Sequence, residues 1–294
     1  MFAFLILIGK RRINVWGFLL FPPEQLPKVD MRRMWRAVGG KLDVCRGIGR
    51  NNVLGKIDIF KCTVRNVSNA VESSEHQNKI VKLNPGMLLL KNWMEKEEQV
   101  DIVETCFRLG DGEGGFYRWK RNLWMMCLGK SWNPDSHCYE KIRSSYDYAT
   151  PPPIPPNFVS LVDKAIRAAH SVEDEKVLPS MRPDVCIVNF YEECGRLGLH
   201  EDRDESPQSL KRGLPVVSFS VGDSAEFVYH AISRYRDENA QRIMLNSGDV
   251  LIFGGPSRRI LHGISRLDLQ TAPNWLFRRT GLAAGRLNLT FRQI

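Results

Sequence analysis

Near its carboxyl end the chain reads Arg286-Leu287-Asn288-Leu289-Thr290-Phe291-Arg292, an unbroken alternation of polar and apolar residues. Successive side chains of a β-strand point to opposite faces of a sheet, so this pattern predicts a strand whose apolar side chains enter a core. The other face then carries two guanidinium groups. Guanidinium groups pair with carboxylates in a fixed geometry, so the strand predicts a binding site for a small dicarboxylate.

The spacing of the two arginines restricts how such a site can work. Arg286 and Arg292 are six residues apart, which corresponds to roughly 20 Å in a straight strand. We therefore expect both to reach one small ligand only if the strand twists and the long side chains lean inward.

A second set of residues has the spacing of a metal site. His200 and Asp202 are two positions apart, which places them on one strand face, and His262 follows on a later predicted strand. Two imidazoles and one carboxylate form the facial triad that holds non-haem Fe(II) and leaves positions open. Four other histidines show how freely a third ligand could be chosen: His76, His137, His170 and His230. The order of the motifs along the chain favours His262, and the triad with the two-arginine strand predicts an oxygenase that uses Fe(II), 2-oxoglutarate and O2.

Short alternating segments dominate the second half of the chain. Strands are predicted at 185–191, 216–221, 226–230, 242–245, 250–253, 260–264 and 286–293. The turn signal Asn246-Ser247-Gly248-Asp249 predicts a hairpin between two of them. Many short antiparallel strands with tight turns predict a mainly β, α+β protein with a double-stranded β-helix, or jelly-roll, core.

The preceding region has helical patterns. Met87–Leu90 is a predicted buried strand, Glu95–Leu109 has apolar residues at helical spacing and stops at Gly110, and Asn157 is a predicted cap of a second helix. The expected division is a poorly defined extension over 1–84, helices and a nucleotide-recognition lid over 85–184, and a jelly-roll core over 185–294.

Composition sets broad limits. The chain is 43% hydrophobic and carries a formal net charge of +9, which suits a polyanionic partner without requiring one. Seven cysteines with no Cys-x-x-Cys pair argue against a disulfide framework or a zinc site and favour reduced, intracellular thiols. The apolar run at residues 1–8 is too short to span a bilayer, so no membrane association is expected. A nuclear or cytoplasmic location is predicted, and the single acid in residues 1–29 leaves a mitochondrion or plastid open.

Residues 116–150 combine aromatic and basic side chains, among them Tyr117, Trp119, Lys120, Trp124 and Trp132. Aromatic rings interleaved with positive charges could stack on nucleobases. Such residues more often cover a core, so composition alone leaves the function of this stretch open.

Several motifs together carry a family resemblance. They are Asn189-Phe190-Tyr191, His200-Glu201-Asp202-Arg203-Asp204-Glu205, Gly248-Asp249-Val250, Gly254-Gly255, Arg259 to Gly263, and Arg286 to Arg292. In this order the motifs are specific, and from about residue 84 onward the chain resembles the AlkB family of nucleic-acid dealkylating dioxygenases. Within that family it is most similar to the plant members of the AlkB-homologue-one branch.

The resemblance implies a role for each matching residue. The implied Fe(II) ligands are His200, Asp202 and His262. The implied 2-oxoglutarate contacts are Asn189, Tyr191, Arg286, Asn288 and Arg292, with Arg286 on the distal carboxylate and Arg292 near the proximal one. The implied substrate-binding residues are Trp132 as a base-stacking ring, Tyr146 (or Tyr148) as a lid tyrosine, Asp204 as a base-reading acid, and Arg234 as a backbone or base contact.

The implied activity is oxidative demethylation of N-methylated bases in DNA or RNA with release of formaldehyde. N6-methyladenine in DNA and methylated bases in tRNA both remain open as substrates, and a monomer is expected. One alternative is a 2-oxoglutarate oxygenase that acts on protein or a small molecule, for which Trp132 and the basic surface would not matter. The other is a nucleic-acid-binding homologue without turnover, against which the complete set of iron and cofactor residues argues.

Overall fold

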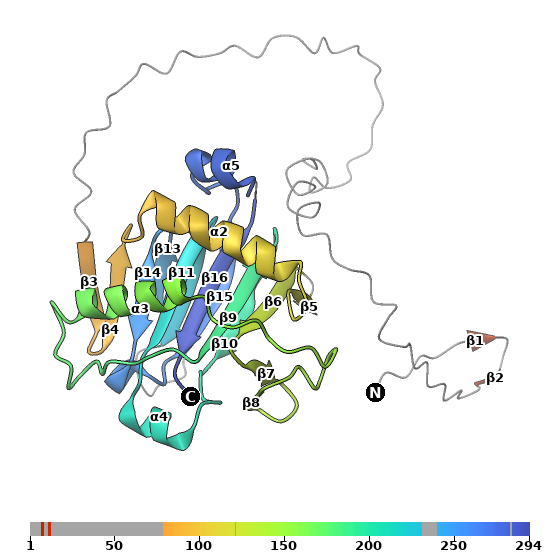
Figure 1. Cartoon of the computed structure of the whole chain (residues 1–294), viewed down its shortest axis with the longest axis horizontal. Coiled ribbons are helices and arrows are strands. Elements are labelled where there is room, and N and C mark those ends of the chain that lie inside the picture. The colour runs from red at the N-terminus through yellow and green to blue at the C-terminus, as the bar shows by residue number, and fades with distance from the viewer. Residues whose placement is uncertain (1–6, 9–10, 13–78, 121, 231–239, 283) are drawn as a thin grey trace, which may run out of the picture.

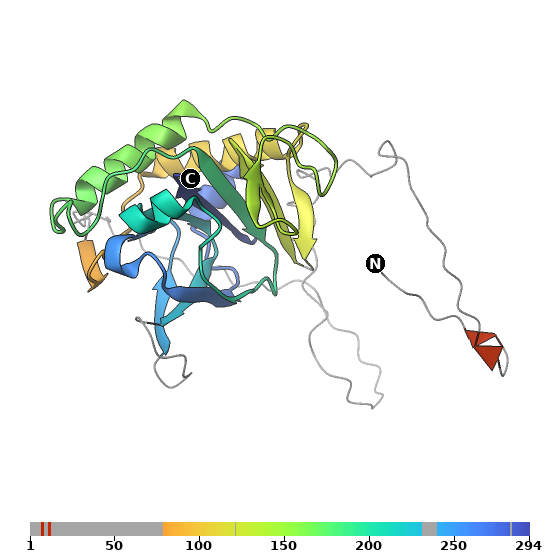
Figure 2. The ribbon, with the colours of Figure 1, turned by 90° about the horizontal axis from the view of Figure 1, so that it is seen from below.

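The computed structural model describes residues 7–8, 11–12, 79–120, 122–230, 240–282 and 284–294. From residue 79 onward, these residues form two facing β-sheets, with two long helices on the outer side of the larger sheet (Figures 1 and 2). The predicted jelly-roll core is confirmed.

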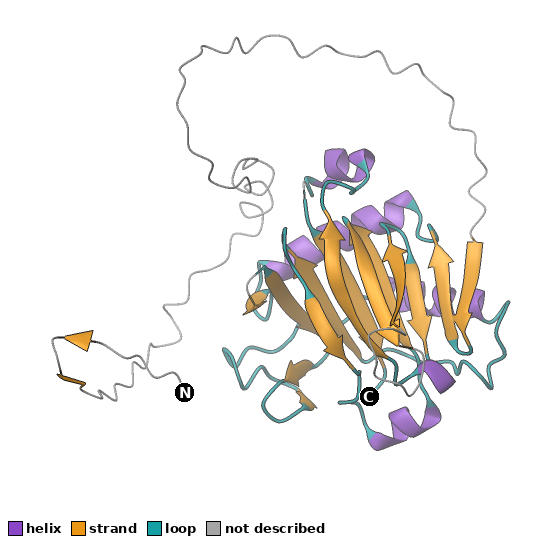
Figure 3. Cartoon of the chain, turned by 180° about the vertical axis from the view of Figure 1, so that it is seen from behind, coloured by secondary structure: helices purple, strands orange, loops and turns teal. Residues whose placement is uncertain are grey.

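The larger sheet has eight strands that run side by side (Figure 3). In spatial order they are β3 (Lys79–Asn84), β4 (Met87–Lys91), β14 (Val250–Phe253), β11 (Val216–Gly222), β16 (Arg286–Arg292), β9 (Val185–Tyr191), β6 (Leu123–Leu128) and β5 (Tyr117–Lys120). All neighbouring pairs in this sheet are antiparallel. Strand β16 therefore lies inside the sheet, between β11 and β9.

The smaller sheet has four strands in the order β10 (Leu197–His200), β15 (Leu261–Asp268), β12 (Ser224–His230) and β13 (Ala240–Leu245). Side chains from both sheets meet in one apolar cluster, in which Phe227 and Ile264 of the smaller sheet join Leu89, Leu251 and Phe253 of the larger one. This cluster packs the two sheets against each other.

Helices cover the outer face of the larger sheet. They are α2 (Lys96–Gly110) and α3 (Pro156–Ala169), whose apolar stripes pack on the strands. The remaining elements are β1 (Leu7–Ile8), β2 (Arg11–Arg12), β7 (Ser131–Asn133), β8 (Cys138–Glu140), α4 (Pro207–Arg212), the 3-10 helix η3 (Gly255–Ser257) and α5 (Asn274–Thr280). Among the helices of the described part of the chain, none is long and apolar enough to cross a bilayer.

Strand β16 has the two faces that its sequence predicts. Leu287, Leu289 and Phe291 are fully buried beneath the helices. The alternate residues, including both arginines, face the space between the two sheets. The polar face of a central strand thus becomes the floor of an internal site.

The predicted hairpin around Asn246 to Asp249 is wrong. Strand β13 pairs with β12 in the smaller sheet, whereas β14 pairs with β11 and β4 in the larger one. The turn is tight, with Gly248 at φ +90°, but it carries the chain from one sheet to the other. A turn signal reports a change of direction and does not identify the strand that will supply the hydrogen-bond partners.

The larger sheet also includes strands from before residue 185. They are β3, which begins at residue 79, and β4, β5 and β6. The division of the chain into an extension, a lid region and a core stays a prediction. Strands β7 and β8 form a separate two-stranded sheet beside the larger sheet (Figure 1).

The second long helix begins two residues earlier than predicted. Helix α3 begins at Pro156, and Pro155 is its N-cap. Asn157 does not cap this helix; its side-chain amide donates to Asp101 of α2. Proline is well suited to the first helical turn because its fixed φ is helical and its missing N–H would have had no partner there.

Candidate active site

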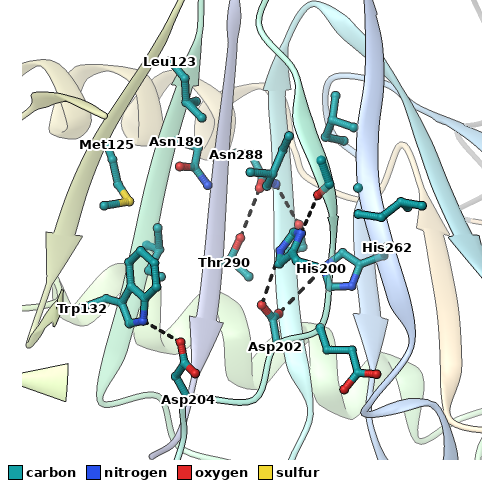
Figure 4. Close-up of a pocket in the computed structure, with 18 of the residues that line it drawn as sticks. Leu123, Met125, Trp132, Asn189, His200, Asp202, Asp204, His262, Asn288 and Thr290 are labelled. Atoms are coloured by element: carbon teal, nitrogen blue, oxygen red, sulfur yellow. Dashed lines mark hydrogen bonds and ion pairs between the residues drawn. The ribbon is translucent and has the colours of Figure 1, made fainter. Parts of the chain in front are cut away.

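A cavity of about 640 Å³ lies between the two sheets, along β16 (Figure 4). Its floor is polar and comes from β16 and β9, with Arg286, Asn288, Arg292 and Asn189 along it. Its walls include apolar side chains of both sheets, and its mouth is bordered by the aromatic lid strand β7. Most of the residues that the sequence predicted for a site line this one cavity.

The metal-binding candidates meet at one end of the cavity. One ligand atom from each of His200, Asp202 and His262 lies within 4.8 Å of the others, and no other group of this kind occurs among the described residues. The antiparallel register of β10 and β15 pairs the two histidines directly. Asp202 differs slightly from the expected position, since β10 ends at His200 and the aspartate follows in the loop.

Backbone contacts orient both imidazoles toward Asp202. Nδ1 of His200 lies 2.9 Å from the carbonyl oxygen of Gly198, and Nδ1 of His262 lies 3.1 Å from that of Ile260. With the proton on Nδ1, the Nε2 lone pairs point to the carboxylate, from which they are 3.7 and 3.9 Å away. Fixing the tautomer through the second nitrogen is how proteins prepare histidine as a metal ligand.

The charge states of these groups also suit a divalent cation. Burial lowers the pKa of His262 to about 4, so the imidazole is neutral at physiological pH. Burial would raise the pKa of the Asp202 carboxyl, but the Arg292 guanidinium and the two imidazoles hold it well below its usual range. A neutral imidazole and an ionised carboxylate are the forms that bind metals.

The two arginines of β16 serve different parts of the cavity. Arg292 lies at the triad, with one terminal nitrogen 2.8 Å from Oδ2 of Asp202. Arg286 lies at the other end of the strand, where its guanidinium donates to Ser220 Oγ at 2.7 Å and to the carbonyl oxygen of Leu245 at 3.3 Å. The two guanidinium groups therefore do not meet at one point. Their separation along the strand fits a ligand that contacts one arginine at each of its ends.

Several buried polar atoms of the residues that line this cavity have no hydrogen-bond partner among the described residues. They include the Tyr191 hydroxyl, Nε of Arg286 and one terminal nitrogen of Arg292. Buried donors without partners are rare and costly, so they indicate a ligand. A dicarboxylate that lies along β16, with one carboxylate at Arg286 and the other near the triad, would satisfy them, and the donor set fits 2-oxoglutarate.

Two asparagine side chains lie on the floor of the cavity, Asn288 and Asn189. Asn288 donates to Ser218 Oγ at 2.7 Å and to the carbonyl oxygen of Phe219 at 3.0 Å, and its own oxygen accepts from Thr290. Asn189 lies opposite it in the β16–β9 register and also lines the cavity. Asn288 is thus held in place by the sheet beside the polar floor.

The lid supplies an aromatic recess next to the triad. The indole N–H of Trp132 donates to Oδ2 of Asp204 at 2.8 Å (Figure 4). Trp119 stands edge-on to Trp132, with ring centroids 5.5 Å apart, and Nδ1 of His137 lies 3.4 Å from the same Asp204 oxygen. The residue types around this recess, flat rings and a carboxylate, are those that recognise a nucleobase.

Sequence reasoning missed Trp119 and His137 as residues of this recess. Trp119 belongs to the aromatic and basic stretch, but nothing local separates it from its neighbours there. In the sequence His137 is only one of several alternative histidines for the metal triad. Its contact with Asp204 joins positions 67 residues apart, which no local pattern predicts.

The predicted lid tyrosine, Tyr146 or Tyr148, does not line the cavity. Tyr146 is 44% exposed and packs on Tyr117, with ring centroids 4.7 Å apart, while Tyr148 is 69% exposed. The buried guanidinium of Arg143 lies near both the Tyr117 and the Tyr146 rings and braces this part of the lid. Arg234 lies outside the described residues, so its role and that of Tyr146 stay predictions.

Comparison with known proteins agrees with this geometry. Residues 86–292 match the sequence profile of the 2OG-Fe(II) oxygenase superfamily. The DNA N(6)-methyladenine demethylase ALKBH1D of Arabidopsis thaliana is 50% identical over 237 residues, which cover 75% of this chain and 52% of that protein. The alpha-ketoglutarate-dependent dioxygenase AlkB of Salmonella typhimurium is 34% identical over 169 residues, which cover 57% of this chain and 68% of that protein.

A solved structure shows the same fold. The structure of OsALKBH1 has 48% sequence identity and a TM-score of 0.69, and the match covers 74% of this chain and 100% of that one. The chain spans about half the length of the Arabidopsis relatives it matches.

The fold and the triad thus define a member of the 2OG-Fe(II) oxygenase superfamily, whose cofactors are those predicted from the sequence. Within that superfamily the chain belongs to the AlkB family, which confirms the resemblance.

Proposed function

We propose that this protein is an Fe(II)- and 2-oxoglutarate-dependent oxygenase that removes methyl groups from nitrogen atoms of bases in nucleic acid. One observation carries the proposal: the recess formed by Trp132 and Asp204 adjoins the His-Asp-His triad within a single cavity. A base held there would present its substituents to the metal end of the site.

The chain's own residues define how the cofactors would be held. The imidazoles of His200 and His262 and the carboxylate of Asp202 would hold Fe(II), and the fully buried Arg286 would pair with the distal carboxylate of 2-oxoglutarate. Burial lowers the pKa of Arg286 to about 10, so it remains positive at physiological pH. When bound, iron and 2-oxoglutarate supply the oxidising power, drawn from O2, that hydroxylates a C–H bond.

The lid residues would position the base. The Trp132 ring can stack on it, which is worth about 1–3 kcal/mol per base. The Asp204 carboxylate can accept an N–H from the base or stabilise a positive charge on it. Apolar wall residues such as Leu123, Phe227 and Phe253 keep water from the reacting carbon. Hydroxylation of an N-methyl carbon yields a hemiaminal, which releases formaldehyde and the unmodified base.

The shape of the site restricts the substrate. A cavity of about 640 Å³ is within the usual range for small-molecule sites and holds a cofactor and one base, but not a base pair. The target base must therefore be unpaired or flipped out of a duplex. The net charge of +9 suits a phosphate backbone.

The names of the plant relatives make N6-methyladenine in DNA the first substrate to test. Methylated bases in tRNA are the second class that we propose to test. We further propose that the protein acts as a monomer inside the cell, in the nucleus, the cytoplasm or an organelle. Size-exclusion chromatography and imaging of a tagged chain would test these two points.

The decisive experiment is mass spectrometry of nucleosides after the purified protein has been incubated with Fe(II), 2-oxoglutarate and mixed methylated DNA and RNA. We expect loss of one methylated nucleoside, an equal amount of formaldehyde, and no loss with His262→Ala. Turnover of 2-oxoglutarate by a protein or small-molecule acceptor, with every methylated nucleoside intact, would contradict the proposal.

A further inference from the structure

Arg258, four residues before His262, is buried beneath the metal end of the cavity and directs its nitrogens to three different groups. It is 3% exposed and is the residue directly after η3, whose N-cap is Gly254. Its Nε donates to the carbonyl oxygen of Leu214 at 2.8 Å, and one terminal nitrogen donates to the carbonyl oxygen of Asp202 at 2.7 Å. The second contact holds the backbone of the carboxylate ligand.

The other terminal nitrogen of Arg258 reaches Glu205. It lies 2.9 Å from Oε1 of Glu205, and Nε of Arg292 lies 3.0 Å from the same oxygen. Neither contact has the angle of a hydrogen bond, and Oε2 has no hydrogen-bond partner among the described residues. The Glu205 side chain is 1% exposed, so it interacts with both arginines mainly through its charge.

These contacts close a ring around the metal ligand. Arg258 holds the backbone of Asp202, Glu205 lies between Arg258 and Arg292, and Arg292 contacts the Asp202 side chain at 2.8 Å. Two carboxylates and two guanidiniums are in contact, so the ring is electrically neutral. Without the Glu205 charge, Arg292 would be balanced by Asp202 alone and would compete with a metal ion for that carboxylate.

We propose that Glu205 and Arg258 are positioning residues of the metal centre. Glu205 shares the charge of Arg292 and so leaves Asp202 available to the metal, while Arg258 fixes the loop from which Asp202 projects. The inference concerns metal affinity and holds for any substrate, so its failure and that of the proposed demethylation can be told apart.

The test is binding of Mn(II), as a stand-in for Fe(II), to the purified chain, measured by electron paramagnetic resonance of the free ion without 2-oxoglutarate. Glu205→Gln keeps the shape of the side chain but removes its charge. We expect about 10- to 100-fold weaker Mn(II) binding, as is usual when a partner of a metal ligand is lost. Thermal unfolding of the metal-free variants would show which of them are folded.

Glu173→Gln is the matched control. Glu173 is also a buried glutamate in an ion pair, with Lys82 at 2.9 Å, but it does not line the cavity. We expect Mn(II) affinity to remain within about twofold of that of the unaltered chain. A loss equal to that of Glu205→Gln would mean that any lost ion pair weakens the site, and would overturn the proposal.

A double variant keeps the test valid if Glu205→Gln does not fold. Glu205→Gln with Arg258→Met removes both charges together, which avoids a buried unpaired charge. It still removes the donor to the Asp202 carbonyl and the partner of Arg292, so we expect Mn(II) affinity to fall about tenfold or more. Unchanged Mn(II) affinity in the folded double variant would overturn the proposal.

Discussion

Two buried histidines, His262 and His230, show how much the surroundings of a single residue decide. Both are less than one-tenth exposed. His262 directs one ring nitrogen to a backbone carbonyl and the other toward Asp202, whereas both ring nitrogens of His230 lack a hydrogen-bond partner among the described residues, and this residue does not line the cavity.

We expect His262→Ala to abolish metal binding and succinate production, because the triad loses one of its three ligands. His230→Ala, a change of the same kind on the same sheet, should retain both. Metal titration and succinate assays of the two folded variants check this. Retained turnover in His262→Ala together with its loss in His230→Ala would reverse the assignment of the third ligand.

Arg286 should set the affinity for 2-oxoglutarate. Arg286→Ala leaves a buried carboxylate of the cofactor unpaired, a penalty of about 3–5 kcal/mol, or at least ~100-fold weaker binding. Isothermal titration with 2-oxoglutarate measures it. Arg242→Ala is the control, since Arg242 is exposed and pairs with Glu226. Equal 2-oxoglutarate affinity in the two variants would rule out the role of Arg286.

We propose two functions for Trp132, and two substitutions can separate them. Trp132→Ala removes the stacking ring, and we expect methylated-oligonucleotide binding to weaken by about 1–3 kcal/mol. Trp132→Phe keeps a ring but loses the donor to Asp204, so binding should largely remain while the preference among methylated bases becomes weaker. Turnover of 2-oxoglutarate without nucleic acid should persist in both. Unaltered oligonucleotide binding by Trp132→Ala would favour a protein or small-molecule substrate.

One buried glutamate after helix α3 connects elements that are distant in the sequence. Glu173, just after α3, accepts from the backbone N–H of Gly86 at 3.1 Å in the β3–β4 turn and pairs with Lys82 of β3. Burial would raise the pKa of the Glu173 carboxyl, but these contacts together hold it below its usual range. Glu173 thus connects the segment after α3 to strand β3 and the β3–β4 turn, at the edge of the larger sheet.

The sign of the effect of pH on Glu173 follows from that shift. A lowered pKa in the folded state means that the stabilisation is present above the unfolded-state pKa of about 4.3 and is lost as the pH falls through the folded-state pKa. Glu173→Gln should therefore unfold at lower temperature than the unaltered chain at pH 7, and the difference should shrink below about pH 4. Thermal unfolding across this range measures it. A difference that does not depend on pH would show that the carboxylate charge has no part in the attachment.

At the scale of the whole molecule, the basic charge should govern binding of nucleic acid. Each phosphate neutralised by Lys or Arg releases counterions, so log affinity falls linearly with log salt. We expect a steep fall for methylated single strands between about 50 and 200 mM salt, measured by fluorescence anisotropy, whereas affinity for 2-oxoglutarate in its buried site should change far less. Oligonucleotide binding that does not respond to salt would argue against a phosphate-binding surface.

The sequence by itself determined the features that depend on local pattern. The alternation in Arg286 to Arg292 predicted a strand with one buried and one polar face, and the order of His200, Asp202 and His262 predicted a site that the structure assembles. These inferences succeed because side-chain direction in a strand follows from backbone geometry alone.

Only the tertiary structure decided which distant groups meet. It placed β13 and β14 in different sheets, brought Trp132 and His137 to Asp204, and surrounded Asp202 with Arg258, Glu205 and Arg292. Strand pairing and buried charge contacts depend on register and packing between segments far apart in the chain, whose alternatives look alike over any short stretch of sequence. The metal ligands can therefore be predicted from the sequence, whereas the residues that hold them in place cannot.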